Sequence, residues 1–260
     1  MLALVTGASS GIGYELAAEL ARRGYDLVAA SSGERLTTAA ENLRAYGHRV
    51  TETTADLATP DGVEKLWEEM EKVGAPLDVA CINAGIGLGG LFKDTDLNEE
   101  LRMINLNCTG TVHLAKYVVK EMTRRGEGRI LFTSSIAGEM VAPREAVYAA
   151  TKAFVLSFAH SLRFELKDSG VTVTALQPGP TDTDFFHRAG MDSTQVGQEG
   201  KKESEPDDVA RQGIDALFDG KDHVYAASLK TKVEGMLANA VPGDVKGAMH
   251  EKMARPVEKK

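Results

Sequence analysis

The sequence predicts an α/β fold, a Rossmann-type doubly wound parallel sheet of about seven strands with helices on both faces. Along the 260 residues, short apolar runs alternate with longer stretches whose apolar residues recur at helical spacing. This alternation favours a parallel sheet, because each right-handed connection between parallel strands then carries a helix. A glycine-rich turn at residues 7–13, between the first run and the first helical stretch, is typical of nucleotide-binding sheets of this class.

The first half of the chain supplies four of the expected strands. Residues 2–5 are apolar, and Ile12, Leu16 and Leu20 then recur at helical spacing. Gly24 ends this helix, as glycine commonly does, and Pro60 suits the first turn of another. The other elements follow from the same periodicities: a helix at residues 36–46 and strands at residues 27–30, 50–54 and 79–82.

The second half contains two long helical stretches, at residues 99–125 and 148–167. Strands are expected at residues 129–133, 171–176 and 224–227, and a shorter helix begins near Pro206. The two long helices should pack side by side on one sheet face and bury an outer apolar patch in a homodimer or homotetramer. The residues of this patch are Val118, Val119, Met122, Phe154, Phe158 and Leu162.

Charge, cysteine content and hydropathy limit the functional classes. The net charge is −8, so electrostatics does not favour nucleic acid or an anionic membrane as a partner. Cys81 and Cys108 fit buried thiols rather than a disulfide framework. Residues 1–5 are too short for the apolar region of a signal peptide, and no stretch approaches the roughly 18 apolar residues of a membrane span. A soluble cytoplasmic protein is therefore expected.

Two motifs indicate hydride chemistry on a carbonyl or an alcohol. Tyr148 and Lys152 stand four residues apart, which puts a phenol and an ammonium on one face of a helix. A cation about 4 Å from the phenol contributes about 4 kcal/mol at an effective dielectric constant near 20. Lowering a tyrosine pKa from about 10 to near 7 requires roughly that much. The turn that contains Gly7, Gly11 and Gly13 offers backbone N–H groups to a pyrophosphate.

Over nearly its whole length, the chain resembles the short-chain dehydrogenase/reductase family. Besides the two motifs above, the resemblance rests on Asn83-Ala84-Gly85 after an apolar strand, Ser135 thirteen residues before Tyr148, Asn107 within residues 106–110, and Pro178-Gly179 with Thr183. It implies a seventh strand and the strand order 3-2-1-4-5-6-7. It also implies four catalytic residues: Asn107, Ser135, Tyr148 and Lys152.

The resemblance implies a role for each catalytic residue. Tyr148 would exchange a proton with the substrate oxygen, Ser135 would hold that oxygen, and Asn107 would hold a water that links Lys152 to solvent. Ser134 and Asn105 are alternatives to Ser135 and Asn107. The expected cofactor-binding residues are Gly7, Ser9, Ser10, Gly11, Ile12, Gly13, Ser31, Ser32, Arg35, Asp56, Leu57, Asn83, Ala84, Gly85, Tyr148, Lys152, Pro178, Gly179, Thr181 and Thr183.

NADP(H) is expected in preference to NAD(H). A carboxylate at the end of the second strand would bind the adenosine ribose hydroxyls and repel a 2′-phosphate. That strand ends instead in Ser31-Ser32, with no carboxylate before Glu34 and with Arg35 nearby. No basic residue occupies positions 8–10, where many NADP-using members of the family have one. Histidine, cysteine and acidic residues show no metal-ligand spacing, so no metal is expected.

The leading hypothesis is an NADP(H)-dependent oxidoreductase that acts on a ketone or secondary alcohol. One alternative is a catalytically silent nucleotide-sensing or scaffold protein, which the presence of Tyr148 and Lys152 disfavours. Another is a nucleotide-sugar epimerase or dehydratase, whose chains are typically longer.

A single domain is expected, residues 1–260. Its substrate site is expected between residues 85–91, residues 137–144 and a mobile loop at 187–206. This loop could also be a plain surface loop. The role of the C-terminal extension, residues 229–260, and the substrate's identity remain open.

Overall fold

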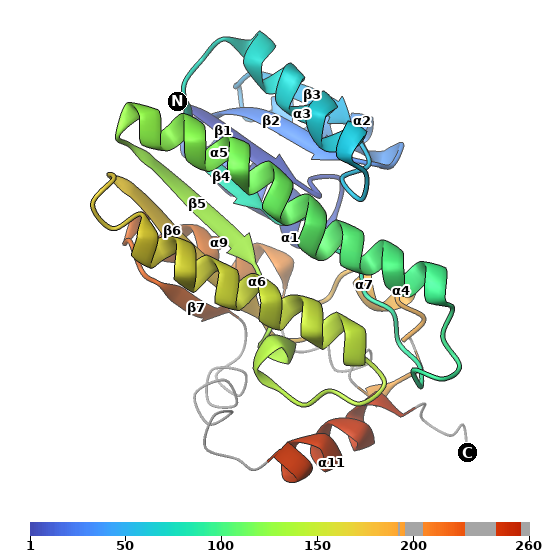
Figure 1. The fold of residues 1–260 in the computed structure, drawn as a ribbon. Coiled ribbons are helices and arrows are strands. Elements are labelled where there is room, and N and C mark those ends of the chain that lie inside the picture. Colours follow the sequence, from blue (N-terminus) through green and yellow to red (C-terminus); the bar gives the residue numbers. More distant parts are fainter. Residues whose placement is uncertain (192, 196–204, 227–242, 256–260) are drawn as a thin grey trace.

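Seven parallel strands form one sheet in the computed structural model, which describes residues 1–191, 193–195, 205–226 and 243–255 (Figure 1). Across the sheet the strand order is β3-β2-β1-β4-β5-β6-β7, so the expected order and the Rossmann-type fold class are confirmed. The strands are β1 (Leu2–Thr6), β2 (Asp26–Ser31), β3 (Val50–Thr54), β4 (Leu77–Ile82), β5 (Gly128–Thr133), β6 (Val171–Pro178) and β7 (His223–Ala226).

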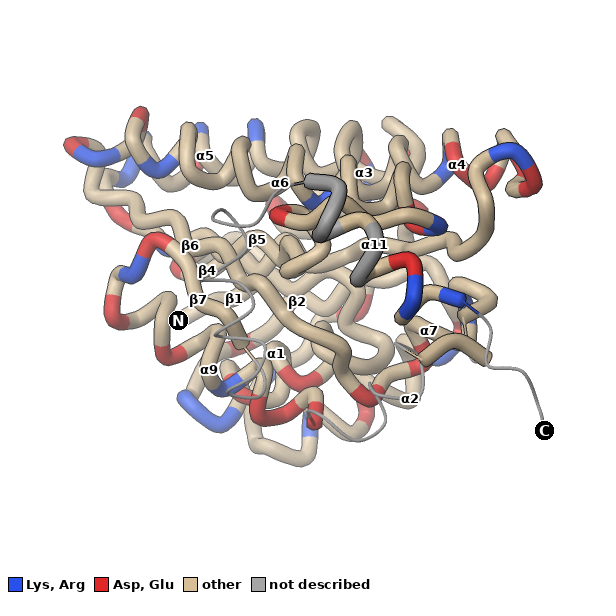
Figure 2. The backbone as a smooth tube through the Cα atoms, turned by 90° about the horizontal axis from the view of Figure 1, so that it is seen from below, with Lys and Arg blue, Asp and Glu red and all other residues tan. Residues whose placement is uncertain are grey.

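Helices cover both faces of the sheet, which Figure 2 shows as two layers. One layer consists of α3 (Pro60–Val73), α5 (Thr111–Arg125) and α6 (Ala146–Glu165). The other consists of α1 (Gly11–Arg22), α2 (Arg35–Arg44) and α9 (Pro206–Phe218). Because alternate strand residues point to opposite faces, Leu4 and Phe132 lie in the first apolar core and Val5 and Leu131 in the second.

The first long helix differs from the expectation in its middle. It begins as α4 (Leu97–Ile104), continues through a π-helical segment, η1 (Asn105–Gly110), and goes on as α5. Gly110 brings this segment close to the chain after β3, since a Cβ there would lie 2.1 Å from the backbone oxygen of Leu57. π-helical segments are rare and occur frequently at functional sites. The second long helix, α6, begins two residues before Tyr148 rather than at it.

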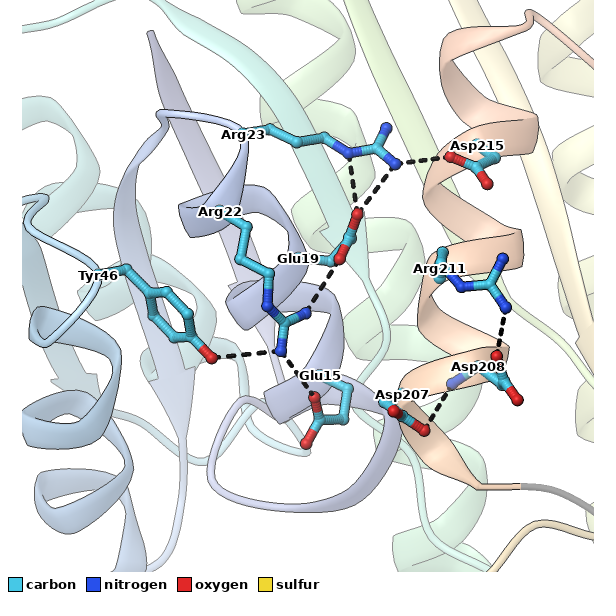
Figure 3. A network of polar contacts seen from close by, with 9 residues as sticks. All are labelled: Glu15, Glu19, Arg22, Arg23, Tyr46, Asp207, Asp208, Arg211 and Asp215. Carbon is cyan, nitrogen blue, oxygen red and sulfur yellow. Dashed lines mark hydrogen bonds and ion pairs between the residues drawn. The ribbon is translucent and has the colours of Figure 1, made fainter.

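A polar network joins α1 to α9 (Figure 3). Glu19 accepts hydrogen bonds from Arg22 and Arg23, both at 3.0 Å, and Arg23 Nη2 donates to Asp215 Oδ1 at 2.6 Å. Asp215 and Arg22 are about half exposed, so each ion pair contributes about 0–1 kcal/mol. Apolar residues of both helices share one buried core, which holds α9 against the helix that follows the glycine turn.

The expected assembly patch is wrong at two of its positions. Val118 and Met122 are fully buried, because with Leu114 they form the face of α5 that packs on the sheet. The others, Val119, Phe154, Phe158 and Leu162, are half-buried or exposed. A more exposed apolar row lies on α4, where Leu97, Leu101 and Ile104 are 64%, 48% and 38% exposed.

Two further helices lie beyond β6: α7 (Phe185–Arg188) and α11 (Gly243–Ala254). Of the expected loop at residues 187–206, Ala189 and Met191 are buried, and the amide of Gly89 donates to the Ala189 carbonyl at 2.9 Å. Residues 192 and 196–204 lie outside the described residues, as does residue 227 of the last expected strand.

Cys81 is buried, Cys108 is half-buried, and both are free thiols. Among the described helices, none is long and apolar enough to cross a membrane.

Candidate active site

A cavity of about 260 Å³ opens at the carboxyl ends of the strands, across β1 and β4. Ligands of doubly wound sheets bind at such a point, because the connections from two neighbouring strands leave there in opposite directions. Every residue that the sequence analysis assigned to the site lines this cavity, except Arg35 and Asn107. Segments that are far apart in the sequence are therefore brought to one place.

The glycine turn lines the cavity. Gly7 and Gly11 have φ angles of 71° and 56°, a left-handed conformation that favours glycine. Ser10 is the N-cap of α1, yet its side chain makes no capping hydrogen bond, and no acidic residue stands in the first turn. The N–H groups at the start of α1 thus have no capping side chain, and Gly11, Ile12 and Gly13, which carry them, line the cavity. This arrangement fits the phosphate groups of a dinucleotide.

Thr6 ties the glycine turn to the Asn83-Ala84-Gly85 segment. Its Oγ1 accepts hydrogen bonds from the amides of Asn83 at 2.9 Å and Ala84 at 3.0 Å. In return, Asn83 Nδ2 donates to the Thr6 carbonyl at 3.0 Å. These bonds hold the ends of β1 and β4 together where the cavity opens.

The structure separates the roles of the two neighbouring serines. Ser134 is buried, and its Oγ donates to the Lys152 carbonyl at 2.7 Å, so this hydroxyl is used within the protein. Ser135 Oγ accepts from the amide of Ala137 at 3.1 Å and hydrogen-bonds the Tyr148 side chain. Ser135 therefore lies where a substrate oxygen would meet the phenol.

The electrostatics of Tyr148 differs from the expectation. Burial raises its pKa, the Glu145 carboxylate raises it further, and the hydrogen bond to Ser135 lowers it only in part. Lys152 is not among the groups that shift this pKa: its Nζ donates to the Thr133 carbonyl at 2.9 Å and lies 5.8 Å from the centre of the Tyr148 ring. Burial also lowers the pKa of Lys152 to about 8. In this structure Tyr148 is therefore a neutral phenol, a proton donor, at pH 7.

Asn107 lies beside the cavity rather than in its lining. It is buried in the π-helical segment, where its Oδ1 accepts from the Ile86 amide at 3.0 Å. Its Nδ2 donates to the Ile86 carbonyl at 2.9 Å and to Thr151 Oγ1 at 3.0 Å. A Cβ on Gly85 would lie 3.2 Å from both Asn107 Oδ1 and Lys152 Nζ, so these two atoms flank the same backbone. The alternative, Asn105, is exposed.

Serines and arginines surround one end of the cavity. Ser9 and Ser31 share a hydrogen bond of 2.9 Å between their hydroxyls. Arg35 is exposed and pairs with Asp184 at 2.5 Å. Arg188 belongs to the expected loop at residues 187–206 but was not assigned to the cofactor; it reaches from α7 into the cavity lining, and its Nη2 donates to Ser10 Oγ at 3.2 Å. Burial and then the charge of Arg35 lower the pKa of Arg188.

The other end of the cavity is mostly apolar. Ile86 and Met140 come from the segments expected to hold the substrate, and the sequence analysis did not assign the other residues that complete the lining: Glu145, Phe185, Phe186, His250 and Met253. Tyr148 and Phe185 pack with ring centres 5.3 Å apart. His250 and Met253 come from α11, within the extension whose role the sequence left open. Nothing in their local sequence marks them, since only folding brings α11 to the cavity.

A separate cluster lies outside the cavity lining. His160, Asp222 and His223 offer ligand atoms that lie within 4.8 Å of one another, which spacing along the sequence did not reveal. His160 and Asp222 are exposed, and Asp222 pairs with His223 Nδ1 at 3.1 Å.

Comparisons with known proteins agree with this geometry. A family model described as short chain dehydrogenase matches residues 1–193. The oxidoreductase UcpA of Escherichia coli K12 is 35% identical over 178 residues, which are 68% of each chain. The glycine betaine reductase ATRR of Emericella nidulans is 34% identical over 221 residues, which are 83% of this chain but only 17% of that protein.

Solved structures show the same fold. A short-chain dehydrogenase from Sphingobium yanoikuyae in complex with NADPH is 32% identical, with a TM-score of 0.79 over 86% of each chain. A short-chain dehydrogenase/reductase from Burkholderia phymatum in complex with NAD is 22% identical, with a TM-score of 0.85 over 100% of this chain and 97% of that one. The second likeness concerns the fold alone.

Proposed function

Because the chain belongs to the short-chain dehydrogenase family, we propose that it is an NADP(H)-dependent oxidoreductase that reduces a ketone to a secondary alcohol. The observation that carries this proposal is the cavity that holds Ser135, Tyr148 and Lys152 together with the glycine turn. In the reducing direction the protonated phenol would supply the proton that a carbonyl oxygen needs when its carbon receives a hydride.

Each residue has a definite task in this reaction. A bound nicotinamide would supply the hydride to the carbonyl carbon. Ser135 donates a hydrogen bond to the substrate oxygen and holds it beside the phenol. Tyr148 transfers its proton to that oxygen, which leaves a phenolate. Lys152, whose pKa of about 8 keeps it mostly charged at pH 7, stabilises the phenolate. Asn107 positions the backbone of residues 85–86 against Lys152.

The substrate is a mid-sized, mostly apolar carbonyl compound. The end of the cavity near Tyr148 carries the side chains of Ile86, Met140 and Phe185, which favour apolar groups over ions. A panel of such ketones, followed by NADPH absorbance, tests this substrate class.

Loss of the Tyr148 hydroxyl tests the mechanism. We expect Tyr148→Phe to reduce turnover on the order of 10²- to 10⁴-fold and to leave NADPH binding intact, because the hydroxyl supplies the proton. Tyr117→Phe is the matched control, since Tyr117 bonds Glu64 away from the cavity lining. Activity of Tyr148→Phe within about tenfold of the wild type would contradict the assignment, and NADPH binding without turnover of any carbonyl compound would favour a silent nucleotide-binding protein.

The preference for NADP(H) rests on the serine and arginine end of the cavity. Ser31 and Ser32 place no carboxylate there, and Arg188 supplies at Ser10 the positive charge that the turn lacks in the sequence. Arg35 lies near Arg188, and the guanidinium of Arg35 pairs with the carboxylate of Asp184. A charge-assisted hydrogen bond contributes about 1.5–3 kcal/mol, so Arg188 alone would suffice to discriminate a 2′-phosphate from a hydroxyl.

Fluorescence titration tests this preference. Arg188→Met should weaken NADPH binding about 10- to 100-fold and NADH binding much less. Ser31→Asp should weaken NADPH and strengthen NADH, because its carboxylate repels a phosphate and accepts from ribose hydroxyls. Equal losses for both cofactors in Arg188→Met would assign the arginine to the pyrophosphate and contradict its role in the preference.

Assembly as a homodimer or homotetramer also belongs to the proposal. The exposed row Leu97, Leu101 and Ile104 on α4 and the exposed Phe154 on α6 support an apolar interface there. Light scattering at micromolar concentration tests it, with Leu101→Glu expected to shift the mass towards the monomer. A wild-type protein that is purely monomeric would contradict this interface. A cytoplasmic location remains a prediction, and localisation of a fluorescent fusion checks it.

A further inference from the structure

One face of α11 packs on the loop that leads into α6. Figure 1 shows α11 beneath the connection between β5 and α6. Gly247, His250 and Glu251 stand at helical spacing on this face. A Cβ on Gly247 would lie 3.4 Å from Val141 Cγ1, and Glu251 Oε1 accepts from Arg144 Nε at 3.1 Å. The C-terminal helix is therefore fitted to residues 141–145 by shape and by charge.

His250 and Glu145 form a buried pair at this contact. They are only 4% and 6% exposed, and both line the cavity that holds Tyr148. His250 Nδ1 lies 3.1 Å from the Pro143 carbonyl oxygen and must donate to it, because a carbonyl can only accept. His250 Nε2 lies 3.0 Å from Glu145 Oε2, so one proton is shared between them.

Glu145 connects this pair to Tyr148. It is the N-cap residue of α6, but its side chain makes no capping hydrogen bond and turns to His250 instead. Its backbone oxygen accepts from the Ala149 amide at 2.8 Å, in the same helical turn as Tyr148. The charge of its carboxylate is also the second cause of the raised pKa of Tyr148, after burial. Glu145 thus affects both the place and the protonation of the phenol.

The residue before Glu145 is held in a strained conformation. Arg144 has a φ of 67°, and within the described residues it is the only non-glycine with a positive φ. Its carbonyl accepts from the Gly90 amide at 2.8 Å, and its guanidinium reaches Glu251 on α11. Residues 85–91 and α11 therefore hold the start of α6 from two sides. Such strain persists only where the surroundings enforce it.

We propose that α11 acts as a clasp: it holds residues 141–145 and thereby positions Tyr148. His250 cancels the charge of Glu145, and Glu251 holds Arg144, so that α6 begins with the Tyr148 hydroxyl beside Ser135. His250 is a positioning residue, since it acts through Glu145. Residues 243–255 are in this way part of the machinery for carbonyl reduction rather than an appendage. The inference rests on the proposed function for its catalytic part, whereas the docking of α11 is independent of any reaction.

A charge-rescue series tests the role of His250. His250→Gln keeps a polar side chain but leaves the Glu145 carboxylate buried and uncompensated, so kcat should fall about tenfold or more with a smaller change in KM. Glu145→Gln should be milder, because its amide can donate to His250 Nε2. The double variant should recover to within a few-fold of Glu145→Gln, since no buried charge remains. A double variant as impaired as His250→Gln would overturn the proposal and leave a packing role only.

Hydrogen exchange measured without cofactor or substrate gives the second readout. His250→Gln should speed amide exchange in residues 243–255 and 140–145 together, whereas Lys252→Gln, on an exposed position of the same helix, should change neither. Unchanged exchange in His250→Gln would overturn the clasp. If the wild type reduces no carbonyl compound, the proposed function fails, and the exchange result still decides whether α11 is docked through His250. If the wild type is active and His250→Gln is indistinguishable from it, only the clasp fails.

Discussion

The substitution Gly13→Ala has two opposing effects on the stability of the protein. Helix propensity alone predicts that Gly13→Ala, in the first turn of α1, stabilises the protein by about 1 kcal/mol. The tertiary contacts predict the opposite sign. A Cβ on Gly13 would lie 2.2 Å from the backbone oxygen of Gly7 and 2.5 Å from Asn83 Nδ2. Both distances are roughly 1 Å or more inside ordinary van der Waals separation.

Neither neighbour can move freely. The Gly7 oxygen is backbone at the end of β1, and Asn83 Nδ2 donates to the Thr6 carbonyl at 3.0 Å. The start of α1 must therefore shift away from the sheet, and overpacking of this kind costs about 1–3 kcal/mol. The same shift moves the N–H groups that face the cavity. We expect a net loss of stability and a loss of NADPH affinity of about tenfold or more.

The assay is urea unfolding of the cofactor-free protein, combined with fluorescence titration of NADPH. Gly33→Ala is the matched control, because a Cβ on Gly33 meets nothing within 4 Å and its φ is not positive. Its unfolding free energy should stay within about 1 kcal/mol of the wild type. If Gly13→Ala is as stable as Gly33→Ala and binds NADPH equally well, the close approach of α1 to β1 and β4 does not hold the site together.

Three further outcomes are expected. Thr6→Val leaves the amides of Asn83 and Ala84 without their acceptor and should destabilise by about 1–3 kcal/mol with weaker NADPH binding, whereas Thr6→Ser keeps the acceptor and the binding. Burial lowers the pKa of Lys152 to about 8, below the ordinary value of about 10.4. Because the unfolded chain therefore binds this proton more tightly than the folded protein does, the contribution of Lys152 to the free energy of unfolding rises with pH. Between pH 8 and 10 the unfolding free energy of the wild type should therefore rise by roughly 2 kcal/mol relative to Lys152→Met, and parallel curves would show that Lys152 is not desolvated. Arg23→Met, which breaks the contact with Asp215 in Figure 3, should cost less than about 1 kcal/mol in unfolding experiments, and a much larger loss would mean that the network dominates the docking of α9.

Local periodicity was enough to predict the order of the elements and the sheet. The expected strands at residues 2–5 and 171–176 are β1 and β6, each extended by one or two residues, because apolar runs bounded by turns report strands directly. The interruption of the long helix at η1 was not predictable, since π-helical geometry around Asn107 follows from its contacts with Ile86 and Thr151. Val118 and Met122 were misjudged for a related reason: an apolar residue on a helix does not reveal which neighbour covers it.

The sequence by itself determined the family, the fold class and the residues gathered at the carboxyl edge, because these depend on local spacing and on motifs that stay together along the chain. Only the tertiary structure decided which distant groups meet: Arg188 reaches Ser10 across 178 positions, and His250 reaches Pro143 across 107. It also decided the sign of the shift in the pKa of Tyr148. Spacing placed Lys152 near enough to lower that pKa, whereas burial and Glu145 raise it. The physical reason is that desolvation and charge act through everything packed around a group, and that surrounding is assembled from the whole chain.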